Sequence, residues 1–178
     1  MGTPVPEPAP ALHEEPGERV FVGLGANLGG DVSALQRVLI EATHQLAALP
    51  GSRVVARSSL YRTEPVGAAG PDFVNAVVEM RSSMTPQSLL RALLQIEAEH
   101  GRLRPFRHAP RSLDLDLLLF GQRVLDEPAL TLPHPRLHRR AFVLEPLIEL
   151  APGLAHPRLG PLTAWREQAA GQRIHKLP

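Results

Sequence analysis

The stretch RSLDLDLLLF, residues 111–120, decides both the predicted fold and the predicted site of this 178-residue chain. Its leucines alternate with other residues and then continue into an apolar run, a pattern that predicts a buried β-strand. Two carboxylates, Asp114 and Asp116, interrupt this apolar pattern. Side chains of a strand alternate between its two faces, so both acids point to the same face, roughly 7 Å apart along the strand.

Two acids on one face of a buried strand need a counter-charge, because an isolated buried carboxylate is very costly. A divalent cation held between the acids and a phosphate chain provides that charge. Mg²⁺ suits the arrangement, since it commonly takes one or two carboxylates together with substrate phosphates. The alternative is an ion-pair network in which Arg102, Arg104 or Arg111 neutralises the acids. The D-x-D pattern alone leaves both interpretations open.

The preceding stretch, GRLRPFRHAPR at residues 101–111, favours the metal interpretation. It carries four arginines in a segment punctuated by glycine and proline, which predicts a loop. The planar fork of arginine is suited to bidentate contacts with phosphate oxygens. Acids for a metal beside arginines for a polyphosphate therefore predict a phosphoryl-transfer site.

Composition limits the possible partners and settings. The length favours one domain with a sizeable core. A net charge of +1 and an aromatic content of 4% give no indication of nucleic-acid binding, and no apolar run approaches membrane-spanning length. The chain has no cysteine, and residues 1–18 lack a signal-peptide pattern, so we expect a cytoplasmic protein.

The segment pattern predicts one folded domain at residues 19–170, after a disordered extension rich in proline and glutamate at residues 1–18 and before a tail at residues 171–178. The expected elements, in chain order, are a strand at residues 20–24, a glycine-rich turn, a helix from Asp31 or Ser33 to Pro50, strands at residues 53–62 and 73–81, a helix from Thr85 to Gly101, and the strand that carries the two acids. The predicted buried face of the second helix consists of Leu89, Leu90, Leu93, Leu94 and Ile96.

The order β-α-β-β-α-β predicts an α+β fold, a ferredoxin-like sandwich with C-terminal additions. Its helices would cover one face of an antiparallel sheet and leave the other face to a ligand. The predicted additions are an extended stretch at residues 130–136, a helix that begins near Leu137 and is interrupted or restarted at Pro146, and a short helix at residues 162–168 before a loose tail.

Three polar residues each allow a structural and a functional interpretation. Asn75 on a strand can hydrogen-bond a heterocycle or simply the strand edge. Glu97 in the last turn of a helix is placed for a ligand or is a solvated helix acid. His134, fixed between two prolines, packs structurally or donates to a phosphate.

Taken together, these motifs resemble the 6-hydroxymethyl-7,8-dihydropterin pyrophosphokinase family of the folate pathway. The matching segments span about residues 20–152 in the right order. They are GLGANLG at residues 23–29, SLYRTEP at residues 59–65, FVNAV at residues 73–77, APRSLDLDLLLFG at residues 109–121, LPHP at residues 132–135 and RAFVLEPL at residues 140–147.

The resemblance implies transfer of pyrophosphate from ATP, the co-substrate, to the hydroxymethyl group of the pterin, with release of AMP. It implies two Mg²⁺ ions on Asp114 and Asp116, and catalysis by these acids together with Arg104 and Arg111. The residues implied around ATP are Glu97, Arg102, Arg104, Arg111, Leu117, Thr131, His134 and Arg140. Those implied around the pterin are Thr63, Val66, Phe73, Asn75 and Phe142. The expected partners are these two small molecules alone, with neither nucleic acid nor membrane, and we expect a monomer.

The chain also departs from the family pattern. The arginine loop is one residue shorter than the form typical of the family, and His108 stands where a tryptophan occurs. Leu94, Ala129, Pro135 and Glu64 replace a glutamine, an arginine, an aromatic residue and a proline, respectively.

Two rival functions belong to other classes. A non-catalytic ferredoxin-like binding or regulatory module would not need acids in its central strand. A metal-dependent nucleotidyltransferase would leave AMP on the acceptor and release pyrophosphate.

Overall fold

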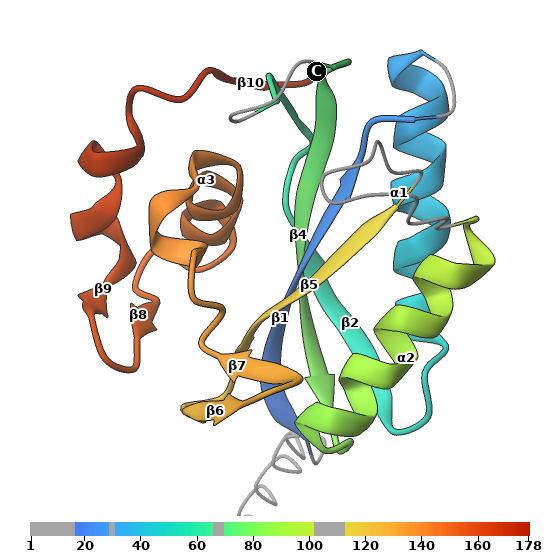
Figure 1. Ribbon diagram of the computed structural model, residues 1–178, viewed down its shortest axis with the longest axis vertical. Helices are drawn as coiled ribbons and strands as arrows, with labels where there is room; N and C mark the ends of the chain where they lie inside the picture. The colour runs from blue at the N-terminus through green and yellow to red at the C-terminus, as the bar shows by residue number, and fades with distance from the viewer. Residues whose placement is uncertain (1–16, 29–30, 66–69, 102–112) are drawn as a thin grey trace, which may run out of the picture.

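An antiparallel sheet forms the centre of the fold, and helices lie on both of its sides (Figure 1). The computed structural model describes residues 17–28, 31–65, 70–101 and 113–178. Within these residues the main sheet has six strands in the order β10-β3-β4-β1-β5, with β2 also paired to β4, and every pairing is antiparallel. The strands are β1 (Glu18–Ala26), β2 (Ser52–Arg57), β3 (Tyr61–Thr63), β4 (Phe73–Ser82), β5 (Asp114–Phe120) and β10 (Ile174–Lys176).

The remaining elements are three α-helices, three 3₁₀ turns and two small hairpins in the described part of the chain. They are α1 (Val32–Ala47), α2 (Pro86–Glu99), α3 (Ala141–Leu150), η1 (Leu137–Arg139), η2 (Leu162–Trp165), η3 (Glu167–Ala169), the hairpin β6 (Leu125–Glu127) with β7 (Leu130–Leu132), and the hairpin β8 (Ala155–His156) with β9 (Gly160–Pro161). None of these helices is long and apolar enough to cross a membrane.

Helices α1 and α2 form one layer, and their sequences specify where they begin. The Asp31 side chain accepts a hydrogen bond from the Ala34 N–H at 2.9 Å, which makes Asp31 rather than Ser33 the N-cap of α1. Thr85 caps α2 in the same way, and Pro86 occupies its first position. The buried faces of both helices pack with one face of the sheet into the main core. Leu94 was predicted on this face but is 45% exposed, because the buried stripe of α2 runs through its neighbour Leu93 instead.

Helix α3 lies on the opposite side of the sheet (Figure 1). Phe21, Val77 and Leu118 project from that side and pack with Leu144 and Leu147 of α3 into a second buried cluster. Helices α1 and α2 share one face, as expected for the sandwich, but the other face is not left entirely to a ligand, because the C-terminal helix α3 packs on it. Large apolar side chains on both faces of β1, β4 and β5 require two covering layers.

The strand predicted at residues 53–62 is divided into β2 and β3, which both pair with β4. Ser58 causes the division. Its backbone N–H donates to the Val77 carbonyl at 2.9 Å, and its hydroxyl accepts from the Val77 N–H at 3.0 Å. The side chain thus takes one place in the hydrogen-bond ladder, and the chain bulges before β3 begins.

The C-terminal third differs from the prediction in three places. The turn η1 and the extended residue Arg140 precede α3, and Pro146 lies inside this helix without ending it. The helix expected at residues 162–168 is a pair of 3₁₀ turns, η2 and η3. The tail expected at residues 171–178 contains β10, which pairs with β3. The predicted extension lies outside the described residues except for Gly17 and Glu18, and Glu18 already begins β1.

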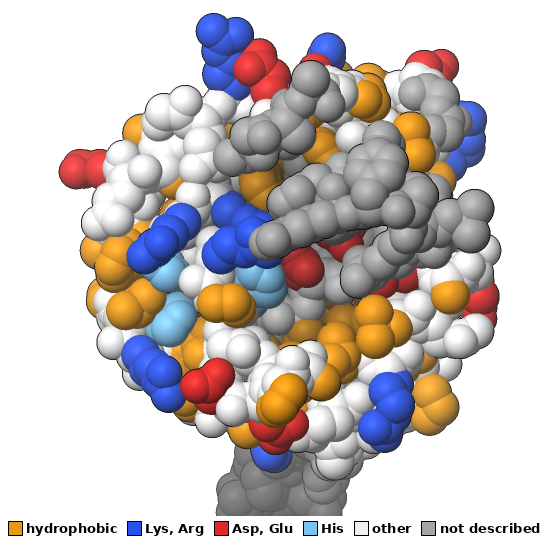
Figure 2. All heavy atoms as spheres, viewed as in Figure 1, with side chains coloured by type: hydrophobic (Ala, Val, Ile, Leu, Met, Phe, Trp, Pro, Cys, Tyr) orange, Lys and Arg blue, Asp and Glu red, His pale blue; other side chains and the backbone are white. Residues whose placement is uncertain are grey.

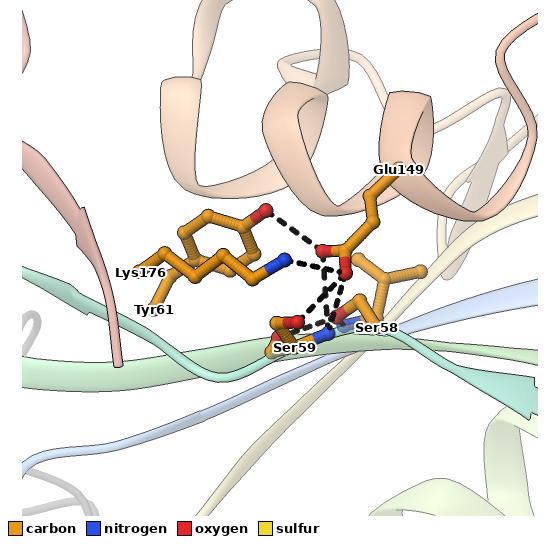
Figure 3. A network of polar contacts seen from close by, with 6 residues as sticks. Ser58, Ser59, Tyr61, Glu149 and Lys176 are labelled. Carbon is orange, nitrogen blue, oxygen red and sulfur yellow. Dashed lines mark hydrogen bonds and ion pairs between the residues drawn. The ribbon is translucent and has the colours of Figure 1, made fainter. Parts of the chain in front are cut away.

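Glu149 of α3 ties the helix to β3 and β10 (Figure 3). Its carboxylate accepts hydrogen bonds from the Ser59 hydroxyl and the Tyr61 hydroxyl, each at 2.7 Å, and from the Lys176 ammonium at 3.1 Å. Although partial burial acts in the other direction, these donors lower the pKa of Glu149 to about 2. Burial and the bond to Glu149 raise the pKa of Tyr61. One carboxylate therefore fixes the C-terminal strand and α3 against the sheet.

We expect Glu149→Ala to lower the free energy of unfolding by about 2 kcal/mol, because several donors lose a charged acceptor. Urea denaturation at pH 7 measures this loss. Glu145→Ala on the same helix is the matched control: it removes a pair with Arg166, whose side chain is 60% exposed, and should cost less than about 1 kcal/mol.

The stabilisation by Glu149 should depend on pH in a defined direction. Its pKa is lower in the folded chain than the ordinary value of 4.5, so the contribution is complete above pH 4.5 and is lost as the pH falls towards about 2. The difference in stability between wild type and Glu149→Ala should shrink over that range. A difference that stays constant would contradict the assignment of the network to the ionised carboxylate.

Candidate active site

The strand register places the two acids and Asn75 on one face of the sheet. Asp116 lies opposite Gly23 of β1, and Asp114 lies opposite Gly25. On its other side Gly25 lies opposite Asn75 of β4. Directly opposite residues of an antiparallel pair share a face, so the prediction that both acids point the same way is confirmed. Leu115 and Leu117 point into the α1–α2 core, whereas Leu118 packs on the side of α3.

Two basic side chains, Arg140 and His134, lie beside Asp116. Its Oδ2 lies 3.4 Å from Nη1 of Arg140 and 3.9 Å from Nε2 of His134. The Asp116 side chain is 33% exposed, so these contacts leave part of the carboxylate open to solvent. Arginine, histidine and acidic side chains gather near the centre of the molecular surface in the space-filling view (Figure 2).

His134 is held in one orientation by two backbone contacts. The backbone N–H of His134 donates to the Leu118 carbonyl of β5 at 2.9 Å, and its ring nitrogen Nδ1 accepts from the Arg136 backbone N–H at 3.2 Å. Burial lowers the pKa of His134 below 6.5, and the opposing charge of Asp116 does not reverse this shift. Because Nδ1 accepts from the Arg136 N–H, the neutral ring carries its proton on Nε2, the nitrogen that lies 3.9 Å from Asp116.

Glu97 fixes the backbone between the two acids. It is 1% exposed at the end of α2, and its Oε1 accepts a hydrogen bond from the Leu115 N–H at 2.8 Å. This contact excludes the interpretation of Glu97 as a solvated helix acid. It holds the start of β5, where Asp114 is half-buried, against α2.

Asn75 is buried over a glycine. Its Nδ2 donates to the Thr63 hydroxyl at 2.8 Å, and both residues are 5% exposed. A Cβ on Gly25 would lie 2.8 Å from the Asn75 Oδ1, closer than real Cβ contacts come. Because Gly25 has no side chain, the Asn75 amide can lie against β1, the strand that pairs with β5.

A cavity of about 350 Å³ is lined by Thr63, the hydrogen-bond partner of this amide, but not by Asn75 itself. Two of the residues predicted around the pterin, Thr63 and Phe142, line it. The other lining residues are Glu64, Pro65, Ala141, Gly171, Gln172 and Arg173. The last three escaped the sequence analysis because no motif marks them; they reach the cavity through the pairing of β10 with β3.

The structure places the remaining predicted residues as follows. Thr131 is half-buried on β7, and Phe73 is half-buried on β4 opposite Thr63. Leu117 is 4% exposed in the α1–α2 core, so its side chain does not reach the face of the acids. The predictions for Arg102, Arg104, Arg111 and Val66 lie outside the described residues.

Comparison with known proteins identifies the family. The family model described as 7,8-dihydro-6-hydroxymethylpterin-pyrophosphokinase (HPPK) matches residues 21–152. The chain belongs to the HPPK family. It is 46% identical to a 2-amino-4-hydroxy-6-hydroxymethyldihydropteridine pyrophosphokinase of Pseudomonas aeruginosa, over 79% of this chain and 85% of the relative. It is 49% identical to an enzyme of the same name from Methylorubrum extorquens, over 76% of this chain and 84% of the relative.

A solved structure shares the fold of this HPPK family member. The alignment with wild-type Plasmodium falciparum HPPK-DHPS has a TM-score of 0.69 and covers 89% of this chain. It spans 45% of that longer chain, at 15% sequence identity. At this identity the likeness shows the fold alone.

The donor set of this HPPK chain fits Mg²⁺ completed by phosphates. Among the described residues, no group of three or more histidine, cysteine or acidic side chains is placed to hold a metal. A protein cage of the kind that binds structural zinc is therefore absent from these residues. Asp114 and Asp116 supply two carboxylates on one face of β5, and Mg²⁺ typically takes its other ligands from phosphates and water.

For this HPPK chain we expect Gly25→Ala to lower the free energy of unfolding by about 2 kcal/mol. The added methyl group would overlap the Asn75 Oδ1, and the amide cannot move away without weakening its bond to Thr63. Thermal and urea denaturation measure the loss. Gly153→Ala is the control, because nothing lies within 4 Å of the position of its Cβ. Equal stability of the two variants would contradict the close approach at Gly25.

Proposed function

We propose that this chain transfers pyrophosphate from ATP to the hydroxymethyl group of 6-hydroxymethyl-7,8-dihydropterin and releases AMP, a step of folate biosynthesis. The observation that carries the proposal is the position of Asp116. Its partly exposed carboxylate lies beside Arg140 and His134, on the sheet face that also holds Asn75. Anion-binding groups and a heterocycle-binding amide thus share one face. Relatives named for this reaction support it at 46% and 49% identity.

The finer fold assignment is the ferredoxin-like sandwich. If β2 and β3 count as one bulged strand, the chain order is β-α-β-β-α-β, and the two central strands are β1 and β4. All pairings are antiparallel, as this arrangement requires. Helix α3, the hairpins and β10 are additions to that sandwich.

Asp114 and Asp116 would hold two Mg²⁺ ions against the phosphates of ATP. When bound, such ions neutralise phosphate charge and ease deprotonation of a nearby hydroxyl. Arg140, whose guanidinium already contacts Asp116, is placed to bind the polyphosphate. His134 adds a neutral N–H donor at Nε2. Arg102, Arg104 and Arg111 are proposed from the sequence to complete the positive surroundings.

The pterin, the acceptor, would bind in the cavity between the end of β3 and the start of α3. Thr63 and Phe142 line the cavity, and Asn75 is fixed next to them by its bond to Thr63. The amide supplies a donor and an acceptor for the pterin ring, and Val66 and Phe73 would complete the pocket. A hydroxymethyl oxygen held here attacks the β-phosphorus: one P–O bond forms, and the bond to the oxygen that leaves with AMP breaks. Such transfer depends on alignment and charge neutralisation more than on covalent chemistry of the protein.

Localisation, oligomeric state and partners complete the proposal. We propose that the enzyme is a cytoplasmic monomer whose partners are these two small molecules. The net charge of +1 supports the absence of a nucleic-acid partner.

Mass spectrometry of the products tests the reaction. Purified protein incubated with ATP, Mg²⁺ and the pterin alcohol should yield AMP and a pterin that has gained a diphosphate. Free pyrophosphate with AMP attached to the pterin would instead identify a nucleotidyltransferase. Absence of any turnover would favour a binding module.

We expect Asp116→Ala to lower the rate of AMP release by about a thousandfold, because charge stabilisation at the phosphates is lost. Coupled detection of AMP measures the rate, and circular dichroism verifies that the variant folds. Asp126→Asn changes an exposed carboxylate of β6 and should leave the rate unchanged. Retention of activity in folded Asp116→Ala would refute the proposed role of the acids.

A further inference from the structure

The segment Gly171–Gln172–Arg173 lies outside the part of the chain that the family model matches, yet it forms one wall of the cavity. The pairing of β10 with β3 brings it there. Ile174 lies opposite Thr63, so Arg173 comes next to Glu64 and pairs with it at 3.0 Å. The Arg173 side chain is 74% exposed, and a surface ion pair of this kind contributes little stability. The contacts that can hold this wall of the cavity in place are therefore those of Gln172.

Gln172 caps the N-terminus of α3 from a distant part of the sequence. The N-cap residue of this helix, Arg140, makes no capping hydrogen bond with its own side chain. Instead, Oε1 of Gln172 accepts from the Ala141 N–H at 3.0 Å, and Nε2 of Gln172 donates to the Arg139 carbonyl at 2.7 Å. One amide therefore satisfies a donor and an acceptor on the two sides of Arg140.

The backbone that Gln172 clamps carries two proposed ligand contacts. The Arg140 guanidinium lies 3.4 Å from Asp116 and 5.4 Å from the centre of the Phe142 ring. Phe142 is the second residue of α3, directly after the capped Ala141. A change in the start of this helix would displace the Phe142 ring. Arg140 would keep a second restraint through Asp116.

The chain that follows Gln172 is attached both to the main sheet and to α3. Two residues after Gln172, β10 begins and pairs with β3, and Lys176 donates to Glu149 of α3. The Leu177 N–H also donates to the Leu60 carbonyl at 2.8 Å. Gln172 is thus held between a strand of the main sheet and the helix that it caps.

We propose that Gln172 is a positioning residue for the acceptor substrate: by capping α3 it holds Ala141 and Phe142 in place as a wall of the pterin pocket. The proposal rests on the proposed function, since it assigns the cavity to the pterin. It adds a residue from the C-terminal segment to a site whose sequence-predicted members lie within residues 21–152.

Calorimetry with Gln172→Ala tests this inference. The ligands are Mg²⁺, an ATP analogue with a methylene group between the α- and β-phosphates, and 6-hydroxymethyl-7,8-dihydropterin. The start of α3 that loses its cap must be ordered again when the pterin binds. We therefore expect the Kd of the pterin, at saturating analogue, to rise about five- to tenfold, the fold-change that corresponds to a helix cap. The Kd of the analogue should change less than twofold, because the Arg140 guanidinium keeps its contact with Asp116.

Gln168→Ala is the matched control, since it removes the same type of side chain from an exposed position in η3. It should bind both ligands like wild type. A merely structural role of Gln172 would lower the melting temperature and leave the pterin Kd unchanged at 25 °C. A pterin Kd within twofold of wild type in folded Gln172→Ala would overturn the proposal.

A second variant covers the case in which Gln172→Ala does not fold. Gln172→Asn keeps the amide but is one methylene shorter, so it cannot span both contacts. It should also weaken pterin binding, and a wild-type Kd would overturn the proposal. The product assay on wild type separates the two hypotheses. Missing AMP release from wild type rejects the proposed function, whereas an active wild type with unchanged Gln172 variants rejects only the role of Gln172.

Discussion

The register between β1 and β5 is the constraint on which the site depends. It places each acid opposite a glycine, and one of those glycines opposite Asn75. A shift of one residue would turn Asp114 and Asp116 into the α1–α2 core and expose the leucines beside them. The leucines that fill the core thus fix the direction of the acids, because moving them out of the core would cost far more than any local rearrangement.

The second face of the sheet serves both packing and chemistry. Phe21, Val77 and Leu118 anchor α3 on it, while the acids and Asn75 lie further along the same strands. Helix α3 begins where the two regions meet, so Arg140 and Phe142 emerge at its N-terminus next to the site. The apolar cluster therefore determines where the basic and aromatic groups come to lie.

The C-terminal segment forms a strand that its local sequence pattern does not predict. Residues 171–178 have no periodicity that predicts a strand, and β10 forms only because β3 offers an unpaired edge. Glu149 then fixes the strand through Lys176 and Tyr61 (Figure 3). The split of β2 from β3 also depends on a specific contact. The Ser58 hydroxyl accepts from the Val77 N–H, where a regular strand would use a backbone carbonyl.

By itself the sequence determined the elements whose signals are local. The alternation around Asp114 and Asp116 specified a strand with both acids on one face, and Thr85 and Pro86 specified where α2 begins. For α1 the sequence offered Asp31 or Ser33 as the cap, and the structure decided for Asp31. The motif spacing also indicated the family that the comparison identified. Tertiary structure alone decided that Glu97 binds the Leu115 N–H, that His134 faces Asp116 and that Gln172 caps α3. These contacts join residues far apart in the chain, and their geometry follows from how the layers pack, which no local pattern of residues encodes.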